Sequence, residues 1–268
     1  MKKLAFCFLC KNRLKNIELW KKYFLGYENK FNTYFHFSEY DKNIKKELPN
    51  MKIVPHQKTS WGNIYNAIFS LYKISFDDNN FKYILLSESC IPVKSFSLTY
   101  KFLTNNQDSF LCYQHHKPKT EWEKATLIQS LERYVNNAKK SKDFLYKVAI
   151  SDWFYNETWN ILNKKHIEVI LNNHSIIKEF ESMSCFAFDE NIVSYILNIN
   201  NELMNINNIK TTFVDWQRAV KDKLGRHPFT FKSINDIDIL KFKNYLFARK
   251  FYDIEGLENK IILGDQRF

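Results

Sequence analysis

Residues 83–92 have the sequence YILLSESCIP, in which an apolar run is followed directly by polar turn residues. The run at residues 83–86 is typical of a short buried strand. Ser87, Glu88 and Ser89 follow at its carboxyl end. Ligands of open α/β sheets bind beyond the carboxyl ends of the strands. The stretch therefore predicts a strand that ends at a binding site and places Glu88 close to the ligand.

Apolar runs alternate with helical patterns on both sides of this stretch, which indicates an α/β fold with a largely parallel sheet flanked by helices. Further strands are expected at residues 4–9, 32–37, 109–113 and 211–214, and a strand or packed segment at 245–251. Helices are expected at residues 16–26, 164–172 and 191–201, and from Ser60 onward, because serine is a good N-cap.

Length and composition favour one domain. A chain of 268 residues with 45% hydrophobic content can bury a sizeable core, and only 5 Gly and 5 Pro argue against long linkers. We therefore expect residues 1–268 to form a single domain. No apolar run approaches the length of a spanning helix, and the N-terminal apolar stretch is too short for a signal peptide. A soluble, cytoplasmic protein is expected.

The formal net charge of +11 is compatible with nucleic acid, an anionic membrane surface or a small phosphorylated ligand. The lysines are spread along the chain, and no RNA- or DNA-binding motif is present, so nucleic acid is not an expected partner. The charge would permit peripheral contact with an anionic membrane.

No metal site is expected. Cys7 and Cys10 lie in an apolar run, where residues three apart face opposite sides of a strand. We expect them to be buried free thiols, which fits a reducing compartment. The pair His115-His116 is predicted to lie in a polar loop, and Asp236-x-Asp238 in a solvated turn. Glycine-rich phosphate loops are also absent, so side chains must hold any diphosphate.

Four segments, in order along nearly the whole chain, resemble the core-2/I-branching β-1,6-N-acetylglucosaminyltransferase family, especially its plant-type branch. The segments are SWG at residues 60–62, LLSESCIP at 85–92, FVDW at 213–216 followed by His227-Pro228, and LFARKF at 246–251. Two softer matches, Thr158-Trp159 and Asp189-Glu190, lie between them.

The resemblance implies a GT-A type nucleotide-sugar-binding fold and an inverting sugar transfer. Most GT-A enzymes carry Asp-x-Asp after a central strand, whereas this chain has the lone carboxylate Glu88, a poor Mg²⁺ or Mn²⁺ site. Metal-independent transfer without a cofactor is expected, with UDP-GlcNAc as donor and a glycan as acceptor. The alternatives are a β-xylosyl- or glucosyltransferase of the same family, or a non-catalytic homologue that binds sugar or nucleotide.

The resemblance also assigns chemical roles. Glu190 is the expected general base, with Asp189 as the alternative. Lys250, with Arg249 beside it, is expected to stabilise the leaving diphosphate, because developing charge must be offset where no metal does so. A second basic residue upstream is expected at Lys232, with Arg226 as the alternative.

Four other residues complete the predicted site. Trp61 would line the donor pocket, unless it is a hydrophobic staple at a helix start. Trp216 would stack on a sugar ring, unless it packs in the core. Ser38 stands where some relatives have a uridine-binding Asp, which weakens the prediction of uridine. Arg133 is the candidate in the acceptor-binding region.

Overall fold

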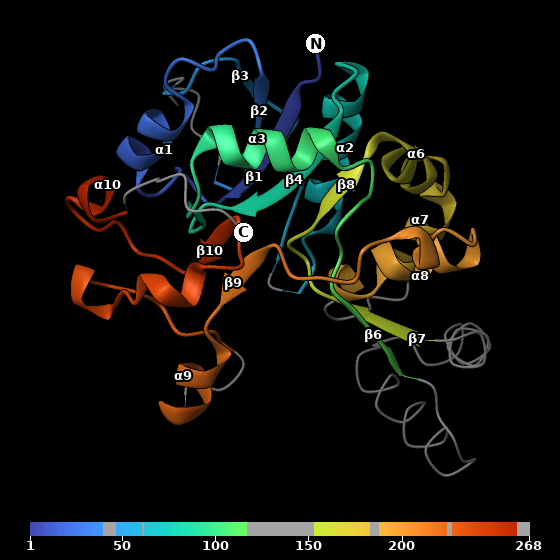
Figure 1. The fold of residues 1–268 in the computed structure, drawn as a ribbon. Coiled ribbons are helices and arrows are strands. Elements are labelled where there is room, and N and C mark those ends of the chain that lie inside the picture. The colour runs from blue at the N-terminus through green and yellow to red at the C-terminus, as the bar shows by residue number, and fades with distance from the viewer. Residues whose placement is uncertain (40–46, 61, 117–152, 183–187, 224–226, 262–268) are drawn as a thin grey trace.

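The computed structural model describes residues 1–39, 47–60, 62–116, 153–182, 188–223 and 227–261. Its centre is a five-stranded sheet in the order β3-β2-β1-β4-β8 (Figure 1). The strands are β1 (Leu4–Cys10), β2 (Phe31–Phe37), β3 (Met51–Ile53), β4 (Lys82–Ser87) and β8 (Ile161–Asn163). Neighbouring strands among the first four are parallel, and β8 is antiparallel to β4. The predicted fold class, a mostly parallel sheet flanked by helices, is confirmed and is consistent with a GT-A-like fold.

One face of the sheet carries an aromatic core around Phe6 of β1. Six aromatic rings lie with centroids 4.9 to 6.4 Å from that of Phe6. They belong to Trp20, Tyr23, Phe24, Phe31, Phe96 and Phe247. Helices α1 (Ile17–Phe24) and α3 (Phe96–Asn105) supply four of these rings and so cover this face.

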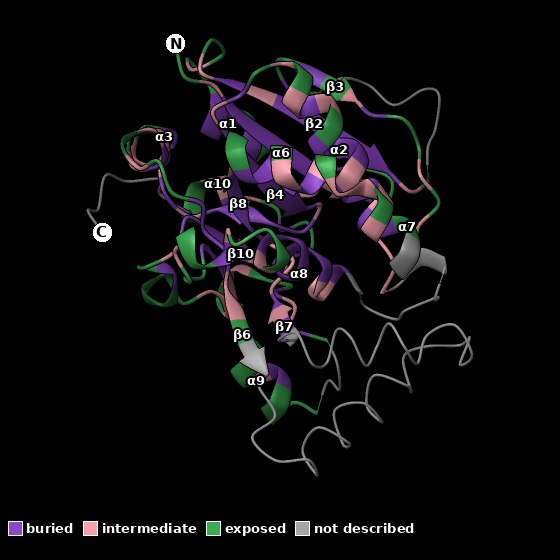
Figure 2. Ribbon diagram, turned by 90° about the vertical axis from the view of Figure 1, so that its right-hand side faces the viewer, coloured by how far each residue is buried: buried purple, intermediate pink, exposed green. Residues whose placement is uncertain are grey.

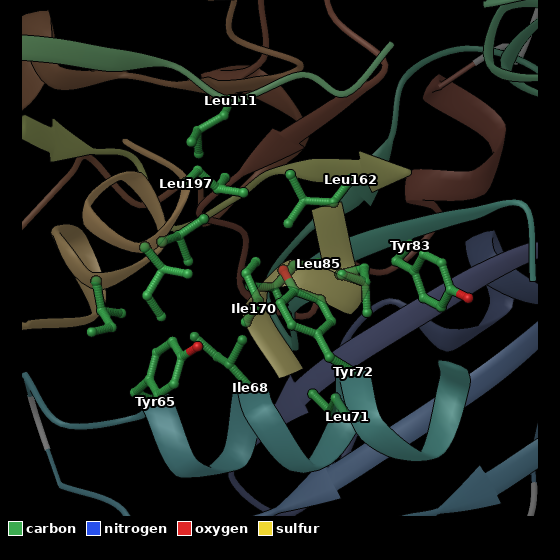
Figure 3. Close-up of a cluster of buried hydrophobic side chains, with 14 of the residues drawn as sticks. Tyr65, Ile68, Leu71, Tyr72, Tyr83, Leu85, Leu111, Leu162, Ile170 and Leu197 are labelled. Carbon is green, nitrogen blue, oxygen red and sulfur yellow. The ribbon is translucent and has the colours of Figure 1, made fainter. Parts of the chain in front are cut away.

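The opposite face is covered by α2 (Tyr65–Asp77) and α6 (Lys164–Asn172), and α8 (Ile192–Ile199) packs beside α6 in the same core. In Figure 3, Ile68 and Tyr72 of α2 lie among Leu85 of β4 and Ile170 of α6. The strands are therefore buried between two helical layers, as Figure 2 shows.

The cysteines of β1 follow the alternation of the strand. Cys7 belongs to the core on the α2 side and Cys10 to the aromatic core, and both are buried free thiols, as predicted. Burial raises the pKa of Cys7 to about 12, so this thiol stays protonated near neutral pH.

A second, three-stranded sheet lies beyond the end of β4 and consists of β5 (Ile91–Pro92), β10 (Phe247–Arg249) and β9 (Thr212–Val214). β10 lies between the other two, antiparallel to β5 and parallel to β9. Phe251, just after β10, bridges to Phe231 and stacks on its ring at 4.5 Å. This packing confirms the expectation of a packed segment at residues 245–251.

Strand β6 (Tyr113–His116) pairs with β7 (Trp153–Asn156) in a two-stranded ribbon that extends away from the main sheet (Figure 1). The prediction of a loop at His115-His116 is therefore wrong, because their backbones pair with β7. The strand predicted at residues 109–113 begins later than expected. Ser109 instead uses its hydroxyl to bind His166, at 2.6 Å, and the amide of Asn163, at 2.8 Å.

The helix predicted to begin at Ser60 begins at Tyr65. Ser60 and Asn63 exchange two backbone hydrogen bonds in a tight turn. Gly62 within that turn has φ of 76°, a left-handed conformation that no right-handed helix can include. Helix propagation from Ser60 is therefore blocked by the backbone at Gly62.

The remaining helical elements are short. They are α7 (His174–Ser182), α9 (Trp216–Lys221), α10 (Leu257–Lys260) and the 3₁₀ turns η1 (Phe188–Glu190), η2 (Leu203–Asn205), η3 (Ile234–Asp236) and η4 (Ile239–Phe242). Asp236 and Asp238 act as a capping-box residue and an N-cap, which confirms the predicted turn. Within the described ranges, we find no helix with the length and apolar character needed to cross a bilayer.

We expect Phe6→Ala to lower the free energy of unfolding by about 3–5 kcal/mol, because the substitution opens a cavity in contact with six rings. Leu25→Ala is the matched control, since Leu25 is 75% exposed and should change stability by about 0.5 kcal/mol at most. Urea denaturation of both variants measures the difference, and equal losses would contradict a core centred on Phe6.

Candidate functional site

The sheet grows outward from β1 on both sides: β2 and β3 follow on one side, and β4 and β8 on the other. β1 is therefore the point at which the order of strand addition changes sides. Beyond the carboxyl ends of these strands, backbone hydrogen bonds join the outgoing loops. The amide of Ser38 donates to Cys10 O at 3.0 Å, and the amide of Glu88 donates to Leu9 O at 2.8 Å. This edge, with residues from three strands side by side, is where ligands bind in open α/β sheets.

The segment of residues 250–254 is attached across that edge. The amide of Phe251 donates to Ser89 O at 3.0 Å, just after β4. In the loop after β1, the amide of Asn16 donates to the Asp253 carboxylate at 2.7 Å, and Asn16 Oδ1 accepts from the amide of Ile254 at 2.9 Å. These bonds hold Lys250 beside the ends of β1 and β4.

Three ammonium groups gather at this place, and we call Lys15, Lys232 and Lys250 the lysine cluster. Lys15 Nζ lies 5.1 Å and Lys232 Nζ 5.8 Å from the centroid of the Tyr252 ring. Burial lowers the pKa of Lys250, and the positive charges of Arg249 and Lys15 lower it further. The cluster therefore carries a local excess of positive charge that suits an anion.

Glu88 faces the lysine cluster, but its carboxylate is already engaged. Glu88 Oε2 accepts from the backbone amide of Lys11, and Glu88 Oε1 lies 3.4 Å from Lys15 Nζ. In the described part of the chain, no group of three His, Cys, Asp or Glu residues could hold a metal ion. The lone carboxylate at the end of β4 is thus arranged as a partner of cations within the protein.

A second group of charges, the carboxylates Asp189 and Glu190, lies at the start of α8. Their position is fixed by β7, because Asn156 Oδ1 accepts from the Ser194 amide at 3.1 Å and from the Ser194 hydroxyl at 2.9 Å. Asn191 also donates to Phe154 O at 3.1 Å. These bonds attach the first turn of α8 to β7 and hold Glu190 in place.

The environment of these carboxylates favours their protonated forms. Burial raises the pKa of Glu190 to about 7, and the negative charges of Asp189 and Glu157 act in the same direction. Burial raises the pKa of Asp189 to about 6. Glu190 can therefore gain and lose a proton near neutral pH, which is the property a general base needs.

Arg249 and Lys250 serve the two groups of charges separately. The Arg249 guanidinium lies 4.3 Å from the centroid of the Trp159 ring, and its Nε is buried without a hydrogen-bond partner among the described residues. Burial lowers the pKa of Arg249, whereas the negative charges of Glu157 and Glu190 oppose this. Arg249 thus faces the carboxylates, and Lys250 faces the lysine cluster and Glu88.

The other predicted residues are placed less centrally. Trp216 is the first residue of α9 and is 41% exposed, so the alternative that it packs in the core is wrong. Lys232 is exposed beside Tyr252, and Ser38 lies at the end of β2. Three predicted residues, Trp61, Arg133 and Arg226, lie outside the described residues.

Sequence reasoning missed Lys15 and Tyr252. Lys15 lies in a loop without a motif, and its nearness to residue 252 depends on hydrogen bonds between segments more than 230 positions apart. The one available sign was the position of Tyr252, an aromatic residue directly after the LFARKF segment. This position does not reveal that the Tyr252 ring lies beside Lys15 and Lys232.

Two comparisons with known proteins bear on this site. The family model described as "Branch: Core-2/I-Branching enzyme" matches residues 4–245. The chain is also similar to "Glycosyltransferase BC10" of Oryza sativa subsp. japonica, with 20% identity over 325 aligned residues that cover 96% of this chain and 75% of the rice protein.

The raised pKa of Glu190 makes a testable statement about stability. A carboxyl whose pKa is raised by folding contributes stability that is full below its unfolded pKa of about 4.3 and is lost as the pH rises to about 7. Glu190→Gln removes this loss, so we expect its melting temperature to exceed that of wild type at pH 8 and to match it near pH 4.

Glu202→Gln is a control for which we expect the opposite change in melting temperature at pH 8. Hydrogen bonds from Lys165 and then Asn205 lower the pKa of Glu202, so its contribution is present above an unfolded pKa of about 4.3 and is lost as the pH falls. This variant should melt below wild type at pH 8. Thermal denaturation at both pH values measures the two effects, and a destabilised Glu190→Gln at pH 8 would contradict the burial of an ionisable Glu190.

Proposed function

This chain belongs to the core-2/I-branching enzyme family and is a glycosyltransferase, and we propose that it transfers a sugar with inversion and without a metal ion. The donor is a nucleotide diphosphate sugar and the acceptor is a glycan. The observation that carries the mechanism is the pair of opposite sites on either side of Arg249-Lys250. The half-buried carboxyl of Glu190, with a pKa of about 7, lies on one side, and the lysine cluster lies on the other.

Inverting transfer needs one base and one site for the leaving group. Glu190 takes the proton from the acceptor hydroxyl, whose oxygen attacks the anomeric carbon of the donor on the face opposite the diphosphate. The bond between the anomeric carbon and the diphosphate oxygen breaks, and its electron pair leaves with that oxygen. The lysine cluster stabilises the negative charge that develops there.

Arg249 has a supporting role in this scheme. Its guanidinium lies on the Trp159 ring, and its charge acts on Glu190 and lowers the pKa of that carboxyl against the effect of burial. A positive charge next to the base keeps part of it ionised at neutral pH. The same charge favours the negative donor phosphates over a neutral sugar.

The proposal of metal independence is supported by the engagement of Glu88. A divalent cation in a GT-A site needs carboxylate oxygens, and Mg²⁺ and Mn²⁺ prefer several of them. Here the Glu88 carboxylate accepts from the Lys11 amide and pairs with Lys15. Ammonium groups thus occupy the surroundings in which a metal would otherwise neutralise the diphosphate.

UDP-GlcNAc is the proposed donor, and a β-xylosyl or glucosyl donor is the alternative within the same family. The alternative that is not an enzyme is a non-catalytic homologue. The raised pKa of Glu190, which suits a general base, argues against this alternative. Contact with an anionic membrane stays a prediction from the net charge of +11, and co-sedimentation with anionic vesicles would test it.

Donor hydrolysis and transfer, measured over a panel of nucleotide sugars with EDTA present, test the proposal. We expect one UDP-sugar to be turned over, and Glu190→Gln to lose about 10²–10⁴-fold in kcat while it still binds UDP. Lys250→Ala should weaken UDP binding as well as turnover. Turnover that requires Mn²⁺, or a fully active Glu190→Gln, would disprove the mechanism, and binding without turnover would favour the non-catalytic homologue.

The pH dependence of kcat/KM provides a separate test. Because the base must be ionised, kcat/KM should rise with pH and level off above a pKa near 7. Asp189→Asn removes a negative charge that raises the pKa of Glu190, so the rising limb should move to lower pH. A limb that stays in place would exclude Glu190 as the titrating group.

A further inference from the structure

We propose that Lys15 is a third cation for the donor diphosphate and that Glu88 holds it in position until the donor binds. This inference rests on the proposed function, because it assigns a residue to the same donor site. No sequence motif marks Lys15, and its role follows from its contacts in the fold.

The backbone places Lys15 directly at the end of β4. The amide of Lys15 donates to Glu88 O at 3.0 Å, while the amide of Glu88 donates to Leu9 O at 2.8 Å. The loop after β1 is therefore joined to the turn after β4 at Lys15 itself. The Lys15 side chain is 22% exposed, so it lies within the edge but is not sealed from solvent.

Glu88 is the fixed member of the pair. One of its carboxylate oxygens accepts from the Lys11 amide, and the other lies 3.4 Å from Lys15 Nζ. A carboxylate held by a backbone amide has little freedom, whereas a lysine side chain has four rotatable carbon bonds. Lys15 is therefore the group that can move when a competing anion arrives.

The lysine cluster has more positive charge than the protein neutralises. Lys11 pairs with Glu39 at 3.0 Å and Arg13 pairs with Asp253, so these cations have partners of their own. No carboxylate within 4.0 Å pairs with Lys232 or Lys250 in the described ranges. Glu88 is thus shared among several cations.

Tyr252 brings two of these charges together. Its ring has Lys15 Nζ at 5.1 Å and Lys232 Nζ at 5.8 Å from the centroid. The π-face of this ring attracts both ammonium groups. Bound diphosphate would attract Lys15 more strongly than Glu88 does, because its negative charges exceed that of a single carboxylate. The geometry therefore favours transfer of Lys15 from Glu88 to the phosphates.

The test is the phosphate contribution to binding, defined as the ratio of the dissociation constants for uridine and UDP. We expect Lys15→Met to reduce this ratio by about tenfold, which corresponds to about 1.4 kcal/mol, through weaker UDP binding. Uridine affinity should stay within about twofold of wild type. Lys21→Met is the matched control, since Lys21 pairs with Glu18 on α1 and should leave both affinities unchanged. Isothermal titration calorimetry measures all three proteins.

Salt dependence gives a second readout that a merely structural lysine would not change. The UDP affinity of Lys15→Met should fall less steeply with added salt than that of wild type, because one phosphate contact is missing. Retained uridine binding shows that the variant is folded, and Lys15→Gln repeats the test with a polar side chain. Wild-type UDP affinity in Lys15→Met and Lys15→Gln overturns the inference. A wild-type protein that binds UDP no better than uridine overturns the proposed function as well.

Discussion

The candidate site depends on the hydrogen bonds that attach residues 250–254 to the carboxyl edge of the sheet. Asn16 supplies a backbone donor, a side-chain donor and a side-chain acceptor to this segment, and Ser89 O accepts from Phe251. Without these bonds, the sheet would present Glu88 and the loop after β1 without Lys250. The central sheet is built by packing of apolar faces, whereas the site is built by a few polar contacts between distant segments.

The charged groups of the site are divided between two neighbouring residues. Arg249 lies on Trp159 and near Glu190, whereas Lys250 lies near Lys15 and Glu88. Two different charge environments, the carboxylates of Asp189 and Glu190 and the lysine cluster, are thus contacted by consecutive residues. The separation also keeps the cationic cluster from holding Glu190 permanently ionised, which a direct ion pair would do.

Much of the fold could be predicted because its signals are local. The apolar runs of β1 and β4 and the helical pattern of α6 were identified from residues that are adjacent in the chain. The predicted start of α2 at Ser60 is wrong, because the left-handed backbone of Gly62 outweighs the N-cap preference of Ser60. The strand that ends before Glu88 is predicted from the sequence and confirmed, but the pairing of Glu88 with Lys15 is not predicted. That pairing is set by tertiary hydrogen bonds, which leave no periodic pattern in the sequence.

The attachment of Asn16 to Asp253 and Ile254 also has a consequence for biosynthesis. The sheet strands β1, β2 and β4 can pair early, since they occur within the first third of the chain. The lysine cluster cannot form until the segment around residue 253 has left the ribosome, because the hydrogen-bond partners of this segment lie near the start of the chain. Contacts of such long sequence separation form late and slowly. A nascent chain can therefore form its central sheet well before the lysine cluster is assembled.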